Sequence, residues 1–352
     1  MLQHAKWLVA LGHDVSILGV TRSDVTEQGV MFLACSGMAH VLALLKDKYQ
    51  DADLILINVT EGLAQLRLAL PRAAIVEVCQ NGPHFVNDQY IDLYALVGHG
   101  QFAYYTVNHK RHRHKFVLLL SVPPWRAVYE QLQPSTERRQ IIWVGSLKKQ
   151  GFRRWAKAMR TVMERNDGLK WVLCVPSYDP IWRGKAPKEL AGLTLPTERI
   201  EVRNFRPNEL AQEIARSTML LASLGGEDGP VSYLDGHAAG VPVLCGDDIF
   251  GKFYNPEGIG MRCTSVGDCV AAIEFLLANP EIGRNMGKYG RRWIEGNFTE
   301  AHQQSCIEQF MNYIVLMQQQ TPARICSQSD KKFSLAFWTE RAQIKLANML
   351  QR

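Results

Sequence analysis

The sequence lacks several features that would assign it to a specialised class of protein. Its 8 cysteines are scattered and include no Cys-x-x-Cys pair, which argues against a disulfide framework or a zinc site and indicates free thiols in a reducing compartment. No apolar run approaches the roughly 18–20 residues of a membrane span. The first residues lack the basic-then-apolar order of a signal peptide. There is no internal repeat or low-complexity tract, so we expect a soluble, cytoplasmic, globular protein.

The composition is that of an ordinary globular protein. Its 352 residues are enough for two domains, each with its own core. A hydrophobic fraction of 47% and a charged fraction of 21% argue against extensive disorder. The net charge of +6 comes from 40 basic and 34 acidic residues. This charge is modest for the length, so it suits an anionic ligand or a membrane surface without requiring nucleic acid.

Apolar runs alternate with helical patterns, which predicts an α/β fold with parallel sheets. In the first half the predicted strands are Val15–Val20, Leu54–Val59, Ala74–Cys79, Ala103–Val107 and Val117–Leu120. The polar stretch 131–140 contains Pro134 and is predicted to be a linker. We expect two doubly wound domains, 1–130 and 141–328, and a final helix in 329–352. In such sheets the ligand binds in a cleft at the carboxyl ends of the strands.

The stretch from 225 to 243 carries the clearest chemical signal. Glu227 stands in a Gly-rich loop, Pro230 is placed as in the first turn of a helix, and Asp235 follows inside that helix. A helix N-terminus suits a phosphate, and carboxylates beside it would accept hydrogen bonds from sugar hydroxyls. Phosphate plus polyol indicates a nucleotide-sugar. The alternative is ordinary helix-start chemistry, in which the acids are partners of the helix dipole.

The spacing of these residues resembles the nucleotide-sugar signature of family-4 retaining glycosyltransferases, which have the two-Rossmann-domain GT-B fold. In that signature an acid, seven residues and a second acid precede a small-residue helix and a Gly-x-Pro-Val turn, here ending at Val243. The second acid is Asp235 where the family usually has Glu. Ile141–Ser146 resembles the strand and Gly loop that open the family's nucleotide domain. Ile200–Arg206 resembles its base-holding strand and turn.

This resemblance implies roles for the matching residues. Glu227 would contact the hydroxyls of the donor sugar, and Asp235 would take the ribose hydroxyls. The helix start at Gly229, Pro230 and Val231 would meet the diphosphate or the sugar. The main chain around Arg203 and Asn204 would pair with the base, although the family usually has Gly where Asn204 stands.

The loop after the first strand of the second domain departs from the family pattern. The family's arginine is replaced by Ser146 after Gly145, and the spacing to the next Lys-Gly pair is one residue shorter. Charge that develops on the leaving diphosphate must still be neutralised. The cations that could do this are Lys148, Lys149 and Arg153. Lys149 is the catalytic candidate, and the alternative is a solvated Lys-Lys pair.

The first domain is expected to supply a residue near the reacting centre. Many relatives place a histidine after an N-domain strand, where it approaches the donor sugar. Here Cys79 or Asn81 occupies the matching position and His84 follows in the loop. We take His84 as the candidate and Asn81 as the other choice; an ordinary polar loop residue is the alternative. The family's first strand and Gly-rich acceptor loop have no counterpart, so either the natural start lies upstream of Met1 or the first sheet is abbreviated.

A dense basic run spans 109–115 and reads His-Lys-Arg-His-Arg-His-Lys. It could bind an acidic membrane peripherally or a phosphorylated acceptor, and a solvated cationic edge is the alternative. The histidines at 99, 109, 112 and 114 do not have the spacing of a metal site. We therefore predict no metal. We also predict no nucleic-acid partner, because the run lacks interleaved aromatic residues.

By this resemblance we expect a metal-independent hexosyltransferase. It would move a hexose, with glucose as the first choice, from a UDP-sugar to a glycan or glycolipid precursor with retention, in the synthesis of a bacterial surface polysaccharide. The UDP-sugar is the donor substrate, and no cofactor is expected. Two alternatives stay open: a nucleotide-sugar epimerase or hydrolase of the same fold, and a non-catalytic nucleotide-sugar-binding protein.

Overall fold

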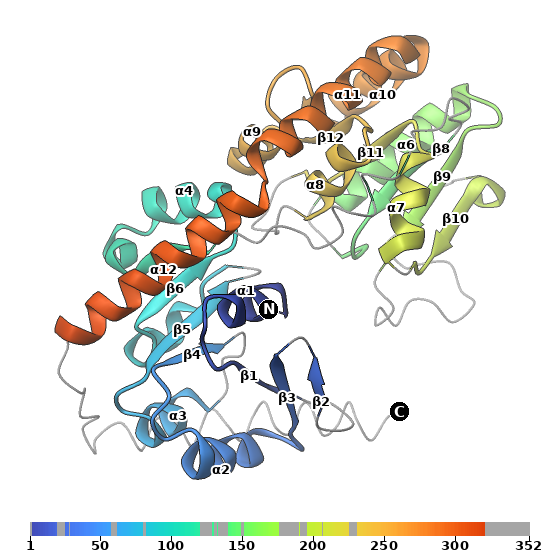
Figure 1. Ribbon diagram of the computed structural model, residues 1–352. Coiled ribbons are helices and arrows are strands. Elements are labelled where there is room, and N and C mark those ends of the chain that lie inside the picture. The colour runs from blue at the N-terminus through green and yellow to red at the C-terminus, as the bar shows by residue number, and fades with distance from the viewer. Residues whose placement is uncertain are drawn as a thin grey trace. The chain divides into compact units, whose positions relative to one another are not determined.

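The computed structural model describes residues 2–19, 25–27, 29–57, 62–79, 82–119, 129, 132, 140–148, 151–175, 190, 196–205, 207–224 and 231–320. These residues form two compact units. Unit 1 contains the described residues up to 97, those of 109–119 and those of 304–320, and unit 2 contains those of 98–108 and of 129–303. Both units are α/β with mostly parallel sheets, as the sequence predicted (Figure 1). The domain limits 1–130, 131–140 and 141–328 stay predictions, and the helix predicted in 329–352 lies outside the described residues.

The described part of unit 1 contains two sheets. Its elements are α1 (Leu2–Ala10), β1 (Ser16–Gly19), β2 (Val25–Glu27), β3 (Val30–Ala34), α2 (Met38–Lys48), β4 (Leu54–Ile57), α3 (Leu63–Ala69), β5 (Ala74–Cys79), the 3₁₀ helix η1 (Phe85–Tyr90), β6 (Leu93–Leu96), the 3₁₀ helix η2 (Lys110–Lys115) and β7 (Phe116–Leu118). Strands β4, β5, β6 and β7 form a parallel sheet in that order. Strand β3 lies between β1, to which it is parallel, and β2, to which it is antiparallel.

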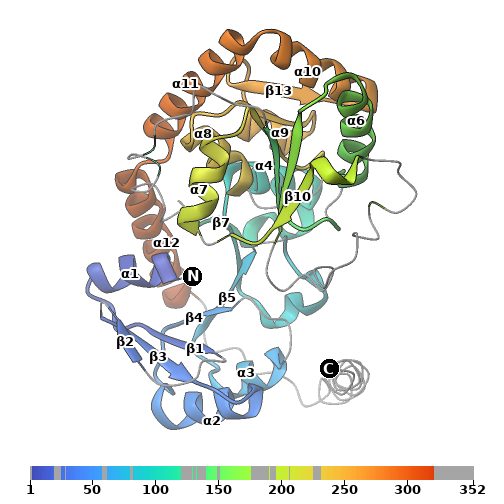
Figure 2. The same ribbon diagram turned by 90° about the vertical axis from the view of Figure 1, so that its right-hand side faces the viewer.

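The two sheets of unit 1 end on β1 and β4, which lie next to one another in both views (Figures 1 and 2). The order of the described strands is therefore β2-β3-β1 followed by β4-β5-β6-β7. In a doubly wound sheet one central strand lies between the strands that correspond to β1 and β4. Among the described strands of unit 1, none is paired with both β1 and β4, so the two sheets are separate.

The long helix α12 (Glu300–Gln320) covers one face of the four-stranded sheet (Figure 1). Its Ile307, Phe310 and Ile314 recur at helical spacing and are buried in one cluster with Val76 of β5 and Leu8 of α1. Burying side chains of this size contributes about 1.5–3 kcal/mol each. Apolar contacts therefore pack helix α12 against the four-stranded sheet and α1 of unit 1.

The described part of unit 2 contains a six-stranded, fully parallel sheet in the order β10-β9-β8-β11-β12-β13. Its elements are α4 (His99–Asn108), β8 (Gln140–Val144), α6 (Phe152–Arg165), β9 (Lys170–Cys174), the 3₁₀ helix η5 (Thr197–Arg199), β10 (Ile200–Arg203), α7 (Pro207–Ala215), β11 (Met219–Leu221), α8 (Val231–Ala238), β12 (Val243–Gly246), α9 (Ile249–Tyr254), β13 (Gly260–Cys263), α10 (Val266–Ala278) and α11 (Pro280–Asn297). Numbered from β8, the order is 3-2-1-4-5-6, which is that of dinucleotide-binding doubly wound folds.

The core of unit 2 is built on large aromatic side chains. Trp143 of β8, Trp171 of β9 and Trp155 of α6 are fully buried. Phe152 stacks on Trp171 with ring centroids 5.7 Å apart. The indole Nε1 of Trp155 donates to the carbonyl oxygen of Ala222 at 2.7 Å, so this polar group is buried with a partner. The indole thereby ties α6 to the carboxyl end of β11.

One predicted strand is wrong. The run Ala103–Val107 lies inside helix α4, and the strand that precedes it is β6. The run Phe-Ala-Tyr-Tyr-Thr-Val suits a strand by its side chains alone. Tertiary contacts decide otherwise: Gly100 packs against Tyr254 of α9, whose hydroxyl accepts a hydrogen bond from the Gly100 N–H at 3.0 Å.

Helix α8 buries a histidine completely. The Nε2 of His237 lies 2.9 Å from the carbonyl oxygen of Tyr254, and its ring meets Trp293 edge to face. Burial lowers the pKa of His237 from 6.5 to about 4, and the hydrogen bond to Tyr254 offsets this only in part. The imidazole is therefore neutral at neutral pH, with its proton on Nε2.

This burial predicts a pH dependence of stability. Between pH 6.5 and about 4 the unfolded chain binds a proton at His237 that the folded protein does not, so the free energy of unfolding falls as the pH falls. Over the full interval the contribution of His237 to the free energy of unfolding falls by about 3 kcal/mol. Urea unfolding of wild type and His237→Gln from pH 7 to pH 4.5 measures it, because glutamine can donate to Tyr254 and does not titrate. We expect the stability gap between them to narrow toward low pH; a constant gap would contradict a neutral His237.

Candidate functional site

The strand order of unit 2 reverses between β8 and β11. These neighbours are paired in parallel, with Leu220 opposite Ile142 and Leu221 opposite Trp143. The chain leaves β8 toward β9 on one side of the sheet order and leaves β11 toward β12 on the other side, so the loops that follow these two strands diverge. Ligands of doubly wound sheets bind outside the carboxyl ends of strands at such a switch point. The loops after β8 and β11 are therefore the candidate site.

The loop after β8 has the backbone that its glycines permit. Gly145 has φ +133° and Gly151 has φ +88°, which are conformations that favour glycine. A Cβ on Gly151 would lie 2.4 Å from the Cβ of Leu224 and 2.8 Å from its backbone nitrogen. The start of α6 thus touches the first residues of the segment that follows β11, and only glycine fits at position 151.

The start of α6 is electropositive. The helix has no acidic residue in its first turn and no side-chain cap, and its second residue is the exposed Arg153. Lys148 is exposed in the preceding loop, where its backbone N–H donates to the Ser146 hydroxyl at 3.2 Å. Cations beside the positive end of a helix dipole repel it, so an anion bound there would relieve the repulsion. Lys149 lies outside the described residues.

The predicted base-binding residues lie at the end of β10. Arg203 is about half exposed, forms an ion pair with Glu201 and lies over the ring of Phe205. The carbonyl oxygen of Arg203 already accepts a hydrogen bond from the N–H of Val175 at 3.0 Å. The exposed Asn204 follows it. Of the two residues predicted to bind the base, Arg203 therefore already has its carbonyl oxygen hydrogen-bonded to the segment that follows β9.

Asp235 is buried in the second turn of α8, with 2% of its surface exposed. Its Oδ1 accepts a hydrogen bond from the hydroxyl of Tyr129 at 2.8 Å. Arg291 of α11 holds the backbone around this tyrosine, since its guanidinium donates to the carbonyl oxygens of Tyr129 and Leu132 at 3.0 Å each. The second acid of the signature is therefore anchored by a residue that sequence reasoning did not single out. Tyr129 precedes the predicted linker, with no motif around it to mark it.

The part of the signature before Val231 lies beyond the described residues. Val231 is the first residue of α8, and 55% of its surface is exposed. Glu227, Gly229 and Pro230 fall in the stretch between Leu224 and Val231, which is outside the described ranges. Their predicted roles stay predictions.

In unit 1, His84 follows the carboxyl end of β5. Its side chain is 56% exposed, and its Nδ1 lies 2.5 Å from Oε1 of Glu77, whose side chain is 2% exposed. Burial raises the pKa of Glu77, and the hydrogen bonds and charge of His84 lower it part of the way back. Glu77 was missed by sequence reasoning, although an acid inside the apolar run Ala-Ile-Val-Glu-Val-Cys was a signal. Asn81 lies outside the described residues.

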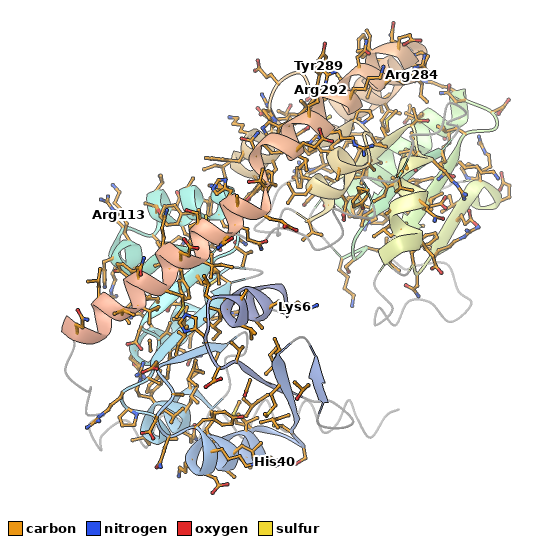
Figure 3. All side chains as sticks on the ribbon, viewed as in Figure 1. Lys6, His40, Arg113, Arg284, Tyr289 and Arg292 are labelled. Carbon is orange, nitrogen blue, oxygen red and sulfur yellow. The ribbon has the colours of Figure 1, made fainter. Side chains whose placement is uncertain are left out.

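Part of the basic run 109–115 is buried in unit 1. Lys115 is buried, with its Nζ donating to the Asp88 carboxylate at 2.9 Å and to two backbone carbonyl oxygens. The ring of His112 stacks on Phe85 and lies 3.2 Å from the same carboxylate. Both residues therefore stabilise the fold of unit 1. The outward-facing members are Lys110, Arg111, Arg113 and His114, of which Arg113 is labelled in Figure 3.

The described ranges contain neither a cluster of candidate metal ligands nor a helix suited to a membrane span. No group of three or more His, Cys, Asp or Glu side chains is placed there to hold a metal ion. In the same part of the chain, no helix is both long enough and apolar enough to cross a membrane.

Comparison with known proteins gives the fold. No protein-family model and no curated protein matches the chain. A solved glycosyltransferase from Rickettsia africae is similar, with 13% identity, a TM-score of 0.69 and coverage of 89% of this chain and 93% of that chain. Sucrose-phosphate synthase from Thermosynechococcus elongatus has 15% identity, a TM-score of 0.66 and coverage of 90% and 92%. The chain has the GT-B fold. HepE from Anabaena, solved in complex with UDP-glucose, has 11% identity, a TM-score of 0.63 and coverage of 81% and 87%.

The Tyr129 hydroxyl gives a prediction about the candidate site. Tyr129→Phe deprives the buried Asp235 carboxylate of a donor, so the free energy of unfolding should fall by about 1–3 kcal/mol. Tyr289→Phe is the matched control, because Tyr289 lies on α11 of the same unit with 55% of its surface exposed (Figure 3). Its effect should stay within about 0.5 kcal/mol. Equal effects of the two substitutions on urea unfolding would rule out the anchoring role.

Proposed function

We propose that the protein is a glycosyltransferase that takes a hexose from a UDP-sugar and transfers it, with retention, to a glycan or glycolipid precursor of a bacterial surface polysaccharide. The observation that carries this proposal is the switch point between β8 and β11. The loop after β8 is fixed by glycines, and the chain after β11 runs into the Glu227–Asp235 segment. In this proposal the phosphate contacts and the acids that bind the sugar would lie at one edge of one sheet.

Each part of a nucleotide-sugar has a matching chemical group in this proposal. The diphosphate would lie at the helix starts after β8 and β11, where Lys148, Lys149 and Arg153 neutralise its charge without a metal. Asp235 would hold the ribose, and its burial strengthens any hydrogen bond it accepts. Glu227 would contact the donor sugar.

The similar structures suggest the first donor to test. HepE was solved with UDP-glucose, so UDP-glucose is the reasonable starting ligand. We place the protein in the cytoplasm, with the outward cations of 109–115 touching an acidic membrane or a phosphorylated acceptor. This contact belongs to the proposal, because glycolipid precursors lie at a membrane surface.

Ligand binding and turnover separate the proposal from its alternatives. Thermal-shift measurements with UDP-, GDP- and ADP-sugars should show the largest stabilisation with a UDP-sugar, since a ligand that binds the native state raises the melting temperature. Release of UDP that depends on an acceptor supports a transferase. Release without an acceptor supports a hydrolase, and conversion of the sugar without release supports an epimerase. Binding with no turnover under any acceptor would favour the non-catalytic binder and overturn the proposal.

The first acid of the signature gives the sharpest test of mechanism. Glu227→Ala should lower turnover by about 100-fold or more if the carboxylate contacts the transition state. Glu257→Ala is the control, because this glutamate is in the same unit and its side chain is 91% exposed. Steady-state kinetics of the two folded variants measures the difference. Unchanged turnover in Glu227→Ala would remove this residue from the active site.

A further inference from the structure

A carboxylate lies inside the core of unit 1. Strand β5 is buried along its whole length, between β4 and β6. Glu77 is paired in register with Ile57 of β4 and Tyr94 of β6. An isolated buried carboxylate costs several kcal/mol unless it is paired and hydrogen-bonded. The buried Glu77 carboxylate therefore needs a hydrogen-bonding partner that offsets this cost.

That partner is His84. The His84 backbone N–H lies 3.2 Å from Oε1 and 3.3 Å from Oε2 of Glu77, and the imidazole Nδ1 lies 2.5 Å from Oε1. The backbone contacts alone would pin the loop after β5. The side-chain contact does something more, because it fixes the orientation of an imidazole that is otherwise half exposed.

The contact also selects the tautomer of His84. A carboxylate is only an acceptor, so Nδ1 must carry the proton. In the neutral ring the lone pair is then on Nε2. Within the described part of the chain Nε2 has no hydrogen-bond partner, and the ring lies beyond the carboxyl end of a parallel strand, where ligands of such sheets bind. Nε2 is thus an oriented acceptor for a hydroxyl.

The other titratable groups near the pair stay in one state at assay pH. Burial, together with the charge of Glu77, raises the pKa of the Cys79 thiol. Burial and the Asp88 carboxylate raise the pKa of Tyr94. Burial of Asp88 opposes its ionisation, but Lys115 holds the pKa of Asp88 below its usual value. Cys79 and Tyr94 are therefore neutral at assay pH and Asp88 is charged.

We propose that Glu77 is a positioning residue that holds His84 in the Nδ1–H tautomer, so that His84 Nε2 accepts a hydrogen bond from a sugar hydroxyl of the substrate. The identity of the hydroxyl rests on the proposed glycosyltransferase function; the geometry of the pair does not. The hydroxyl belongs either to the donor sugar or to the acceptor, which share this chemistry.

The first test reads the tautomer and needs no activity. In protein labelled with ¹⁵N-histidine, the nitrogen shifts distinguish Nδ1–H from Nε2–H, and loss of a signal in His84→Ala assigns it. At a pH where the ring is neutral, wild type should show the Nδ1–H form. Glu77→Gln should show a mixture, because its amide can either accept from Nδ1–H or donate to Nδ1. An Nε2–H form in wild type, or no change in Glu77→Gln, would overturn the proposal even if the enzyme is active.

The second test asks whether Glu77 acts through His84. Glu77→Gln should lower kcat at least about tenfold, because a mispositioned group loses much of its effect. It should leave the KM for the nucleotide-sugar within about threefold. In a His84→Ala background the same substitution should have no further effect on kcat. An equal loss in both backgrounds indicates a merely structural role for Glu77 and would overturn the proposal.

Assays with and without an acceptor identify the hydroxyl that His84 contacts. If Glu77→Gln slows UDP release measured without an acceptor, His84 meets the donor sugar. If it slows only transfer to an acceptor, His84 meets the acceptor hydroxyl. If no donor is turned over by wild type, the proposed function has failed, and the tautomer measurement alone decides the Glu77–His84 pair.

Discussion

The close approach of two loops at the centre of unit 2 constrains the candidate site. Gly151 immediately precedes α6 and lies so close to Leu224 that a single added carbon would overlap the Leu224 backbone. That contact is possible because β8 and β11 are hydrogen-bonded neighbours whose chains leave in opposite directions. The indole of Trp155, one turn into α6, donates a hydrogen bond to the Ala222 carbonyl oxygen and so stabilises the same contact between α6 and the segment after β11. In the proposed function, this junction would hold backbone N–H groups in place for a phosphate at little cost of ordering.

Polar groups buried in apolar elements mark the places where this fold departs from simple packing. Asp235, His237 and Glu77 are each almost fully buried, and each has a named partner. His237 is the structural case, because its neutral ring fills a gap between α8, α9 and α11. Asp235 and Glu77 differ from it, since each lies close to the carboxyl edge of a parallel sheet. Such groups are retained either for specificity of folding or for chemistry.

Much of the fold was predictable from periodicity. The alternation of apolar runs and helical patterns predicted the α/β class. The strands at Leu54 and Ala74 begin where they were predicted, and β8 begins one residue before the predicted Ile141. The strand predicted at Ala103–Val107 failed because aromatic and β-branched residues suit strands and buried helices alike. In the candidate site, the motif pointed to Asp235 and to Gly145, but nothing local pointed to Tyr129 or to the pairing of Glu77 with His84. These contacts join residues far apart along the chain or on different elements, so the spacing of residues in the sequence does not predict them.

The sequence by itself determined the fold class, the Gly-rich loops and the spacing of the signature acids. These properties are local, because they depend on side-chain periodicity and on which residues tolerate a given φ. The tertiary structure alone decided that the loop after β8 meets the chain after β11, that Asp235 is anchored by Tyr129, and that a buried carboxylate orients His84. Strand order brings these groups together, and strand order follows from which sheet neighbours bury the most apolar surface, a property of the whole unit.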